Sequence, residues 1–174
     1  MRKSLLILLL GVLALLIPGT VLRTVFPELV APNLMIVLLV WLAFHEISPG
    51  GAVLAFLLGL ELDFCSGMLL GPWAGAYVIV FGLLVLCSRR IFIESAAVVF
   101  LSAFSASLLS ALLYHVMLVL VYGAARLELS ALSTAVIEAG LSAFLAPLLF
   151  HLARRSSPRQ ESEGGVRRVQ ILRG

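Results

Sequence analysis

The sequence predicts an all-α polytopic membrane protein with six transmembrane helices. Three observations carry this prediction: a mean hydropathy of +1.17, 62% hydrophobic residues, and six long apolar stretches separated by short polar breaks. Charged residues make up 12% of the 174-residue chain, about half their usual share in soluble proteins. A water-soluble globule of this composition would lack a polar shell around its core.

The first three stretches are residues 4–22, 29–44 and 51–65. The first follows a basic pair and resembles a signal peptide at its start, but its apolar run is long and no small-x-small cleavage site follows it. We therefore interpret it as an uncleaved span. The second and third stretches are short, and a segment with a proline and paired glycines separates them. Proline lacks an amide donor and glycine favours turns, so two helices are expected.

The last three stretches are residues 69–88, 96–123 and 130–153. A helix that crosses the bilayer needs about 20 mostly apolar residues, and all three provide them. The fifth stretch is longer than the bilayer requires and is expected to tilt or protrude. Pro147 lies in the sixth stretch and is expected to kink it, because a proline removes one bond of the helix.

The placement of basic residues indicates six spans with both termini in the cytoplasm. With the amino terminus inside, ten of the 12 Lys and Arg residues fall on the cytoplasmic side, and only Arg23 and Arg126 fall on the other. An inside excess of Lys and Arg is the usual orientation signal of inner-membrane proteins. We predict a six-helix domain at residues 1–155 and, because residues 156–174 are polar and turn-rich, a disordered basic cytoplasmic tail there.

Composition also excludes several classes of protein. The net charge of +3 is explained by topology signals and contacts with membrane lipids, and no stretch interleaves basic and aromatic residues as a nucleic-acid surface does. Cys65 and Cys87 fall near opposite ends of the fourth stretch. They are too far apart to form a disulfide and too few for a cysteine-based zinc site. We interpret both as small apolar packing residues.

Four ionisable residues lie within the predicted spans, where such groups are costly and therefore candidates for function. Glu61 and Asp63 are two residues apart and point to nearly opposite sides of a helix, so they do not form a catalytic carboxylate pair. The Asp63 carboxylate is expected to bind backbone amides of the next turn or helix, or else a partner protein. His115 and Glu138 are expected to form a hydrogen-bonded pair between helices. No second histidine or carboxylate lies three or four residues from His115, so no metal site is expected.

Small residues form a face on two of the predicted helices. Such faces let helix backbones approach closely, either to hold the bundle together or to dock a helix of another protein. The sequence leaves both alternatives open. The residues in the third span are Gly51, Ala55, Gly59 and Asp63, and those in the fifth are Ser102, Ala106 and Ser110, with Ala103, Ser107 and Ala111 beside them.

Residues 32–71 carry a recognisable pattern. The second span opens on Pro32-Asn33-Leu34, the third closes on Gly59-Leu60-Glu61-Leu62-Asp63, and Ser66-Gly67-Met68-Leu69-Leu70-Gly71 leads into the fourth. This pattern resembles the bacterial rod shape-determining protein MreD family, which has a Pro-Asp-Leu-like opening and a Gly-Leu-x-x-Asp…Gly-x-x-Leu-Gly core. Asn33 replaces the family's usual acid, and an amide can keep the hydrogen bond. The partner-binding or structural motif is therefore Pro32, Asn33, Gly59, Asp63, Gly67 and Gly71.

The resemblance implies a non-enzymatic protein of the bacterial inner membrane, without a cofactor, that belongs to the cell-elongation machinery. That family pairs with MreC, a single-span scaffold protein, and through it with the peptidoglycan polymerase–transpeptidase pair, while MreB filaments lie on the cytoplasmic side. The family fold is thought to look like the six-helix substrate-binding subunit of energy-coupling-factor vitamin transporters. By that analogy, a groove between helices would accept the partner's helix.

Two other functions remain open. The first is a vitamin-binding membrane subunit of an energy-coupling-factor transporter. Such subunits carry an Ala-x-x-x-Ala docking face on their first helix, whereas the first span here offers Gly11 and Ala14 among bulky leucines. The second is a membrane enzyme, for which the sequence provides no plausible catalytic cluster.

Overall fold

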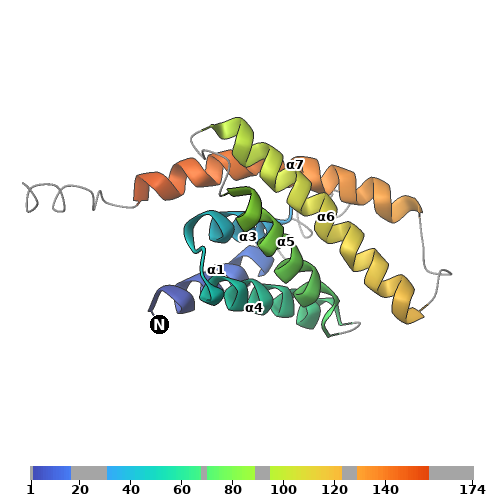
Figure 1. The fold of residues 1–174 in the computed structure, drawn as a ribbon. Coiled ribbons are helices and arrows are strands. Elements are labelled where there is room, and N and C mark those ends of the chain that lie inside the picture. The colour runs from blue at the N-terminus through green and yellow to red at the C-terminus, as the bar shows by residue number, and fades with distance from the viewer. Residues whose placement is uncertain (1, 17–30, 68–69, 89–94, 123–128, 157–174) are drawn as a thin grey trace, which may run out of the picture.

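The computed structural model describes residues 2–16, 31–67, 70–88, 95–122 and 129–156, with the backbone alone at 2–5, 122, 129–132 and 153–156. The described chain is helical throughout apart from short connections, as the sequence predicts (Figure 1). The helices are α1 (Arg2–Leu16), α3 (Leu34–His45), α4 (Pro49–Ser66), α5 (Pro72–Ser88), α6 (Ala96–Tyr122) and α7 (Leu129–Ser156). Each coincides with one predicted stretch. The predicted tail, apart from Ser156, lies outside the described residues.

Side-chain caps determine where α3 and α4 begin. The Oδ1 atom of Asn33 accepts a hydrogen bond from the amide of Ile36 at 3.3 Å, and Ser48 Oγ accepts one from Gly51 at 3.3 Å. Each cap binds an amide that has no partner within the first turn of its helix. Pro49 follows the Ser48 cap as the first residue of α4, a position where the missing proline donor costs nothing.

Three helices are long and apolar enough to cross a membrane: all of α4, residues 96–121 of α6 and Ser133–Leu152 of α7. The apolar parts of α1, α3 and α5 are shorter. With 27 and 28 residues, α6 and α7 are about 40 Å long, which exceeds the thickness of the hydrocarbon core. Helix α7 continues on both sides of Pro147. The kink there stays a prediction.

Helix α3 is the centre of the bundle, because it packs against α1, α4, α5, α6 and α7. Its side chains are apolar on all sides, and Ile36, Leu39 and Val40 are fully buried. Its 12 residues span about 18 Å, less than the thickness of the hydrocarbon core. The extended residues 31–33 lead into α3 and pack beside the middle of α7, as the contact between Asn33 and Ser142 shows. Irregular backbone is tolerated inside a membrane domain where protein encloses it.

Small buried side chains line the packing of α6 and α7. Helix α6 lies against α3, α5 and α7, and α7 lies against α3 and α6. Their backbones approach closely because the buried positions carry alanine and serine. The predicted small-residue face of α6 therefore holds the bundle together from within. Its buried members are Ala103, Ala106, Ser107 and Ser110, and those of α7 are Ala139, Ser142, Ala143 and Ala146.

Candidate functional site

The Asp63 carboxylate joins the end of α4 to the start of α5. Asp63 is only 2% exposed. Its Oδ2 atom accepts hydrogen bonds from the amides of Gly71 at 2.9 Å and Ala74 at 3.1 Å, and its Oδ1 atom accepts one from Trp73 at 3.0 Å. Pro72, between them, has no amide hydrogen to donate. The predicted contact of Asp63 with backbone amides of the fourth span is therefore confirmed.

These three hydrogen bonds explain how a carboxylate can be buried here. The first amides of a helix have no partner within the helix, and the helix dipole places partial positive charge at that end. Asp63 supplies the negative charge and two acceptor oxygens from the preceding helix. Both oxygens accept amide hydrogen bonds and the side chain is buried, so this carboxylate connects the two helices in the described structure.

Gly59 lies one turn before Asp63, where the backbones of α4 and α5 touch. A Cβ atom at Gly59 would lie 2.5 Å from Ala74 Cα and 2.6 Å from the Trp73 carbonyl oxygen. Those are backbone atoms, so no side chain can move aside to relieve the overlap. Only glycine allows α4 to reach the position from which Asp63 binds α5.

The two motif glycines between the helices have backbone conformations that favour glycine. Gly67 ends α4 with φ of +66°, and its amide donates to the Asp63 carbonyl oxygen at 3.3 Å. Gly71 has φ of +121° just before α5 begins. Side chains are disfavoured at positive φ. Gly59, Asp63, Gly67 and Gly71 thus specify one unit, the α4–α5 hairpin (residues 49–88).

Sequence analysis missed the residues that this hairpin presents to Asp63 and to α6. The Trp73 and Ala74 amides carry no side-chain signal, so only their position after Pro72 could have indicated them. The Trp73 ring stacks on Tyr114 of α6, with ring centroids 4.2 Å apart and planes inclined by 16°. This stacking connects the hairpin to α6.

A second polar group, the Asn33 cluster, consists of Asn33, Tyr77, Glu138 and Ser142. The Asn33 amide donates to Ser142 Oγ at 2.7 Å, and Ser142 Oγ donates to the Glu138 carbonyl oxygen at 2.7 Å. The Asn33 side chain also lies close to the Glu138 carboxylate. Asn33 therefore caps α3 and joins it to α7, while the neighbouring Pro32 is half-buried.

The Tyr77 hydroxyl lies close to Asn33 and Glu138 but forms no hydrogen bond of ordinary geometry. Tyr77 is fully buried. Sequence analysis did not single it out, because one tyrosine in an apolar helix gives no sign of which neighbours it meets. The Asn33 cluster thus joins α3, α5 and α7 at one place within the bundle.

The predicted pair of His115 and Glu138 is not the arrangement found. The Nδ1 atom of His115 is 2.7 Å from the carbonyl oxygen of Ala111, within α6 itself, and its ring meets the edge of Tyr114. The Glu138 carboxylate lies close to Asn33 instead. The two residues do lie on neighbouring helices, but Glu138 faces the start of α3, which the depth of a residue in its span does not reveal.

Glu61 lies on the other side of α4 from Asp63, as predicted. A Cβ atom at Gly11 would lie 2.6 Å from Glu61 Oε2, so the carboxylate tip covers Gly11 of α1. That oxygen is buried and has no hydrogen-bond partner, although the residue as a whole is half-buried. Glu61 and Asp63 therefore have different neighbours and do not act as a pair.

The cysteines are free, as predicted, but the interpretation of both as packing residues is wrong. Cys65 and Cys87 are exposed on the outer surface of the bundle. A small, weakly polar thiol is compatible with a lipid-facing position as well as with a core. Hydrophobicity alone therefore does not distinguish a lipid-facing cysteine from a cysteine in the core.

Comparison of the chain with protein families, with curated proteins and with solved structures finds no match. Among the residues that the structure describes, no three His, Cys, Asp or Glu side chains are grouped so that they could hold a metal ion. The candidate site is therefore defined by its own contacts: the α4–α5 hairpin, the Asn33 cluster and Glu61.

Replacing Asn33 with aspartate is expected to destabilise the bundle. The new carboxylate would still cap α3, but it would meet the Glu138 carboxylate without a donor between them. A loss of about 2 kcal/mol in unfolding free energy is expected, measured by denaturant titration in detergent micelles. Adding Glu138→Gln should restore most of it, because the donor then lies on α7. Equal stability of the Asn33→Asp variant and the unmodified protein would contradict the Asn33–Glu138 contact.

Proposed function

We propose that this chain is a non-enzymatic scaffold of the bacterial cell-elongation machinery, in the manner of the MreD family. It crosses the inner membrane six times with both termini in the cytoplasm. It binds an MreC-like single-span protein and thereby helps to position the peptidoglycan polymerase–transpeptidase pair, with MreB filaments as an indirect partner. Membrane lipids surround it.

One observation carries this proposal: the motif carboxylate is used to build the fold. Asp63 is the acid of the pattern shared with the MreD family, and its two oxygens accept three backbone hydrogen bonds from α5. The motif glycines serve the same hairpin. A motif whose residues together specify a rigid helix pair favours a scaffold over an enzyme, which needs an available acid, base or nucleophile.

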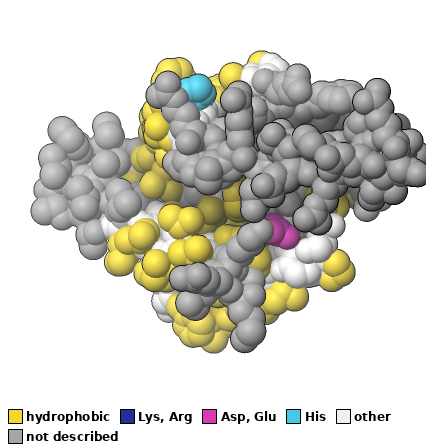
Figure 2. All heavy atoms as spheres, turned by 90° about the vertical axis from the view of Figure 1, so that its left-hand side faces the viewer, with side chains coloured by type: hydrophobic (Ala, Val, Ile, Leu, Met, Phe, Trp, Pro, Cys, Tyr) yellow, Lys and Arg dark blue, Asp and Glu magenta, His cyan; other side chains and the backbone are white. Residues whose placement is uncertain are grey.

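The outer surface also favours a membrane scaffold. Large apolar side chains are exposed along the bundle, among them Phe64 on α4, Leu101 and Leu120 on α6, and Phe144 on α7. Figure 2 shows that the described side chains at one end of the bundle are mostly hydrophobic. Such a surface is stable in lipid and leaves lateral helix contact as the means of binding another membrane protein. The short length of α3 is compatible with a span because the other helices pack around it.

Cell shape provides the test of this function. In a rod-shaped host that depends on its own MreD-like protein, depletion of that protein should give round cells, and expression of this chain together with its own MreC-like partner should restore rods. The matched variants are Gly59→Leu, which should fail, and Gly75→Leu, which should succeed because a Cβ atom at Gly75 meets nothing within 4 Å. Membrane levels of each variant are measured by immunoblot. Round cells despite normal amounts of the unmodified pair would contradict the proposal.

A further inference from the structure

Glu61 is an acid without a partner in the membrane-spanning part of α4. It lies about 7.5 Å along the helix axis from the end of α4 at Ser66. Its Oε2 atom covers Gly11 and has no hydrogen-bond partner, while the residue remains accessible from outside the bundle. The Tyr77 hydroxyl also lacks a partner, but protein encloses it completely. Of these two residues, only Glu61 is accessible from outside the bundle, although its Oε2 atom is itself buried.

The described neighbours of Glu61 offer it no donor. The facing part of α1, Leu6–Leu16, contains only leucine, isoleucine, valine, alanine and glycine, and its helical amides bond within the helix. On α4, Leu57, Leu58 and Leu62 surround Glu61 within one turn. Asp63 is held by α5 on the other side. A carboxyl group in hydrocarbon is stable only with a partner, and such residues in membrane helices are paired or functional.

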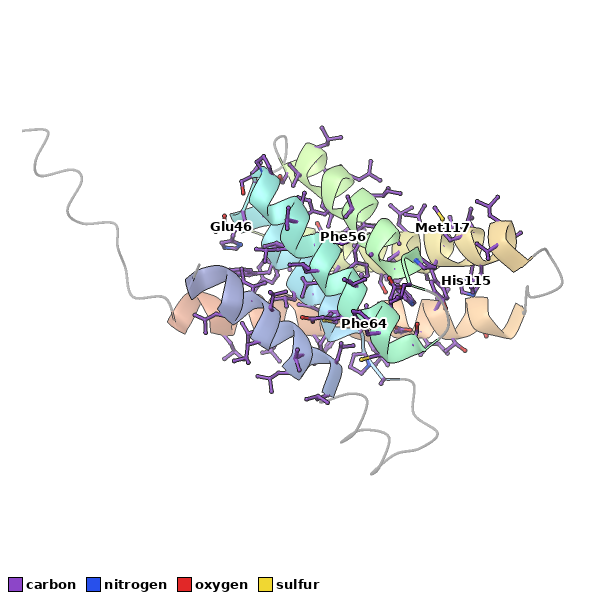
Figure 3. The ribbon with its side chains drawn as sticks, turned by 90° about the horizontal axis from the view of Figure 1, so that it is seen from below. Glu46, Phe56, Phe64, His115 and Met117 are labelled. Carbon is purple, nitrogen blue, oxygen red and sulfur yellow. The ribbon has the colours of Figure 1, made fainter. Side chains whose placement is uncertain are left out.

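Glu61 lies on an exposed apolar surface of α4. Val53 and Phe64 are exposed, and their spacing from Glu61 places them within about 80° of it around the helix. Figure 3 shows α1 and α4 side by side, with Phe56 and Phe64 on α4. We call the surface formed by Val53, Glu61 and Phe64 the Glu61 face.

We propose that the Glu61 face binds the transmembrane helix of the single-span partner through a lysine or arginine on that helix. The inference rests on the proposed function and adds which face binds and what chemistry the partner brings. Charge complementarity selects the occupant, because a cationic donor both neutralises a carboxylate on an apolar surface and hydrogen-bonds to it. Lysine and arginine have long apolar stems that lie along such a surface while the charged end reaches a partner. Glu61 is close enough to the helix end for a basic residue at the membrane boundary to reach it.

The test uses the full chain co-expressed with the MreC-like partner and purified through a tag on the partner. Glu61→Gln keeps the shape and removes the charge, and it should lower the recovered complex at least ten-fold. Glu61→Lys should abolish the complex, and replacement of the partner's basic residue by glutamate should restore it. Phe64→Ala on the Glu61 face should weaken binding. The matched control is Phe144→Ala on α7, which should leave binding unchanged. Both rings are exposed to a similar extent, 77% for Phe144 and 66% for Phe64.

A second measurement separates binding from folding. Cys65 is exposed and lies one turn from Glu61, so in a Cys87→Ser background it should form a disulfide with a cysteine placed near the partner's basic residue. A complex that forms with the unmodified chain, survives Glu61→Gln and Phe64→Ala, and gives no Cys65 cross-link would overturn the Glu61 face and leave the proposed function standing. Absence of any complex with the unmodified chain would overturn both.

Discussion

Replacing Gly59 with leucine is expected to separate α4 from α5 and to remove most of the stability of the bundle. The added side chain would meet the Ala74 and Trp73 backbone, which is fixed by the helix. Separation of the helices would also break the hydrogen bonds that the α5 amides donate to Asp63. Overpacking usually costs about 1–3 kcal/mol, and we expect a loss at or above the upper end of this range. Thermal unfolding in detergent micelles measures it.

Two substitutions provide the controls for Gly59. Gly59→Ala adds only a Cβ atom but should still be destabilising, because that atom itself would lie 2.5 Å from Ala74 Cα. Gly75→Leu, in the neighbouring helix, should leave the unfolding temperature nearly unchanged, because nothing lies within 4 Å of a Cβ atom there. Similar unfolding temperatures for the Gly59→Leu and Gly75→Leu variants would show that α4 and α5 are not in backbone contact.

Asp63→Leu is expected to lose more stability than Asp63→Asn. Leucine leaves the amides of Gly71, Trp73 and Ala74 without an acceptor in a buried place. Each unpaired group costs roughly 1–3 kcal/mol, so several kcal/mol are at stake. Asparagine can keep two of the bonds through its single oxygen but turns a donor toward the Trp73 amide. It should therefore lose roughly 1–3 kcal/mol. Denaturant titration of the purified variants gives both values.

The ranking of the two Asp63 variants distinguishes hydrogen bonding from charge. If the negative charge at the α5 terminus were the main contribution, asparagine and leucine would be equally harmful. Asp63→Glu is a further control, because its longer side chain keeps the charge but shifts the oxygens. Equal losses for asparagine and leucine, with a mild effect of glutamate, would contradict the hydrogen-bonding explanation.

Much of the fold could be predicted from the sequence because helix formation here depends on local properties. Apolar runs between turn residues gave all the described helices. The break at 45–51 was predicted from its proline and glycines, and Ser48 and Pro49 indeed start α4 there. The predicted start of α3 was less accurate. Apolar residues precede Pro32, so composition extended the span to residue 29, whereas the cap at Asn33 begins the helix at Leu34.

The candidate site was partly predictable for the same reason. Asp63, Gly59, Gly67 and Gly71 lie within one hairpin, so their spacing along the chain limits where they meet in space. The contact between Asn33 and Ser142 joins residues 109 positions apart, and no local pattern indicates it. The sequence paired Glu138 with His115 because only charge and depth were available. The structure places its carboxylate close to the Asn33 side chain, since the start of α3 lies inside the bundle.

The Asn33 cluster also gives a physical reason why asparagine rather than an acid precedes α3. An acid at position 33 would cap α3 equally well, but it would face Glu138 of α7. Asparagine supplies the acceptor for the helix without placing a second negative charge beside that carboxylate. The asparagine at position 33 is therefore explained by a residue on α7.

The most direct test of lateral binding within the membrane uses the partner's transmembrane helix alone. The full chain is placed in lipid nanodiscs with that helix, without the partner's soluble domain, and association is followed by energy transfer between fluorophores on the two chains. We expect saturable binding that an unlabelled copy of the helix competes away. Binding that requires the soluble domain, or energy transfer no greater than that of an unrelated single-span helix, would contradict a scaffold that recruits its partner through helix contacts in the membrane.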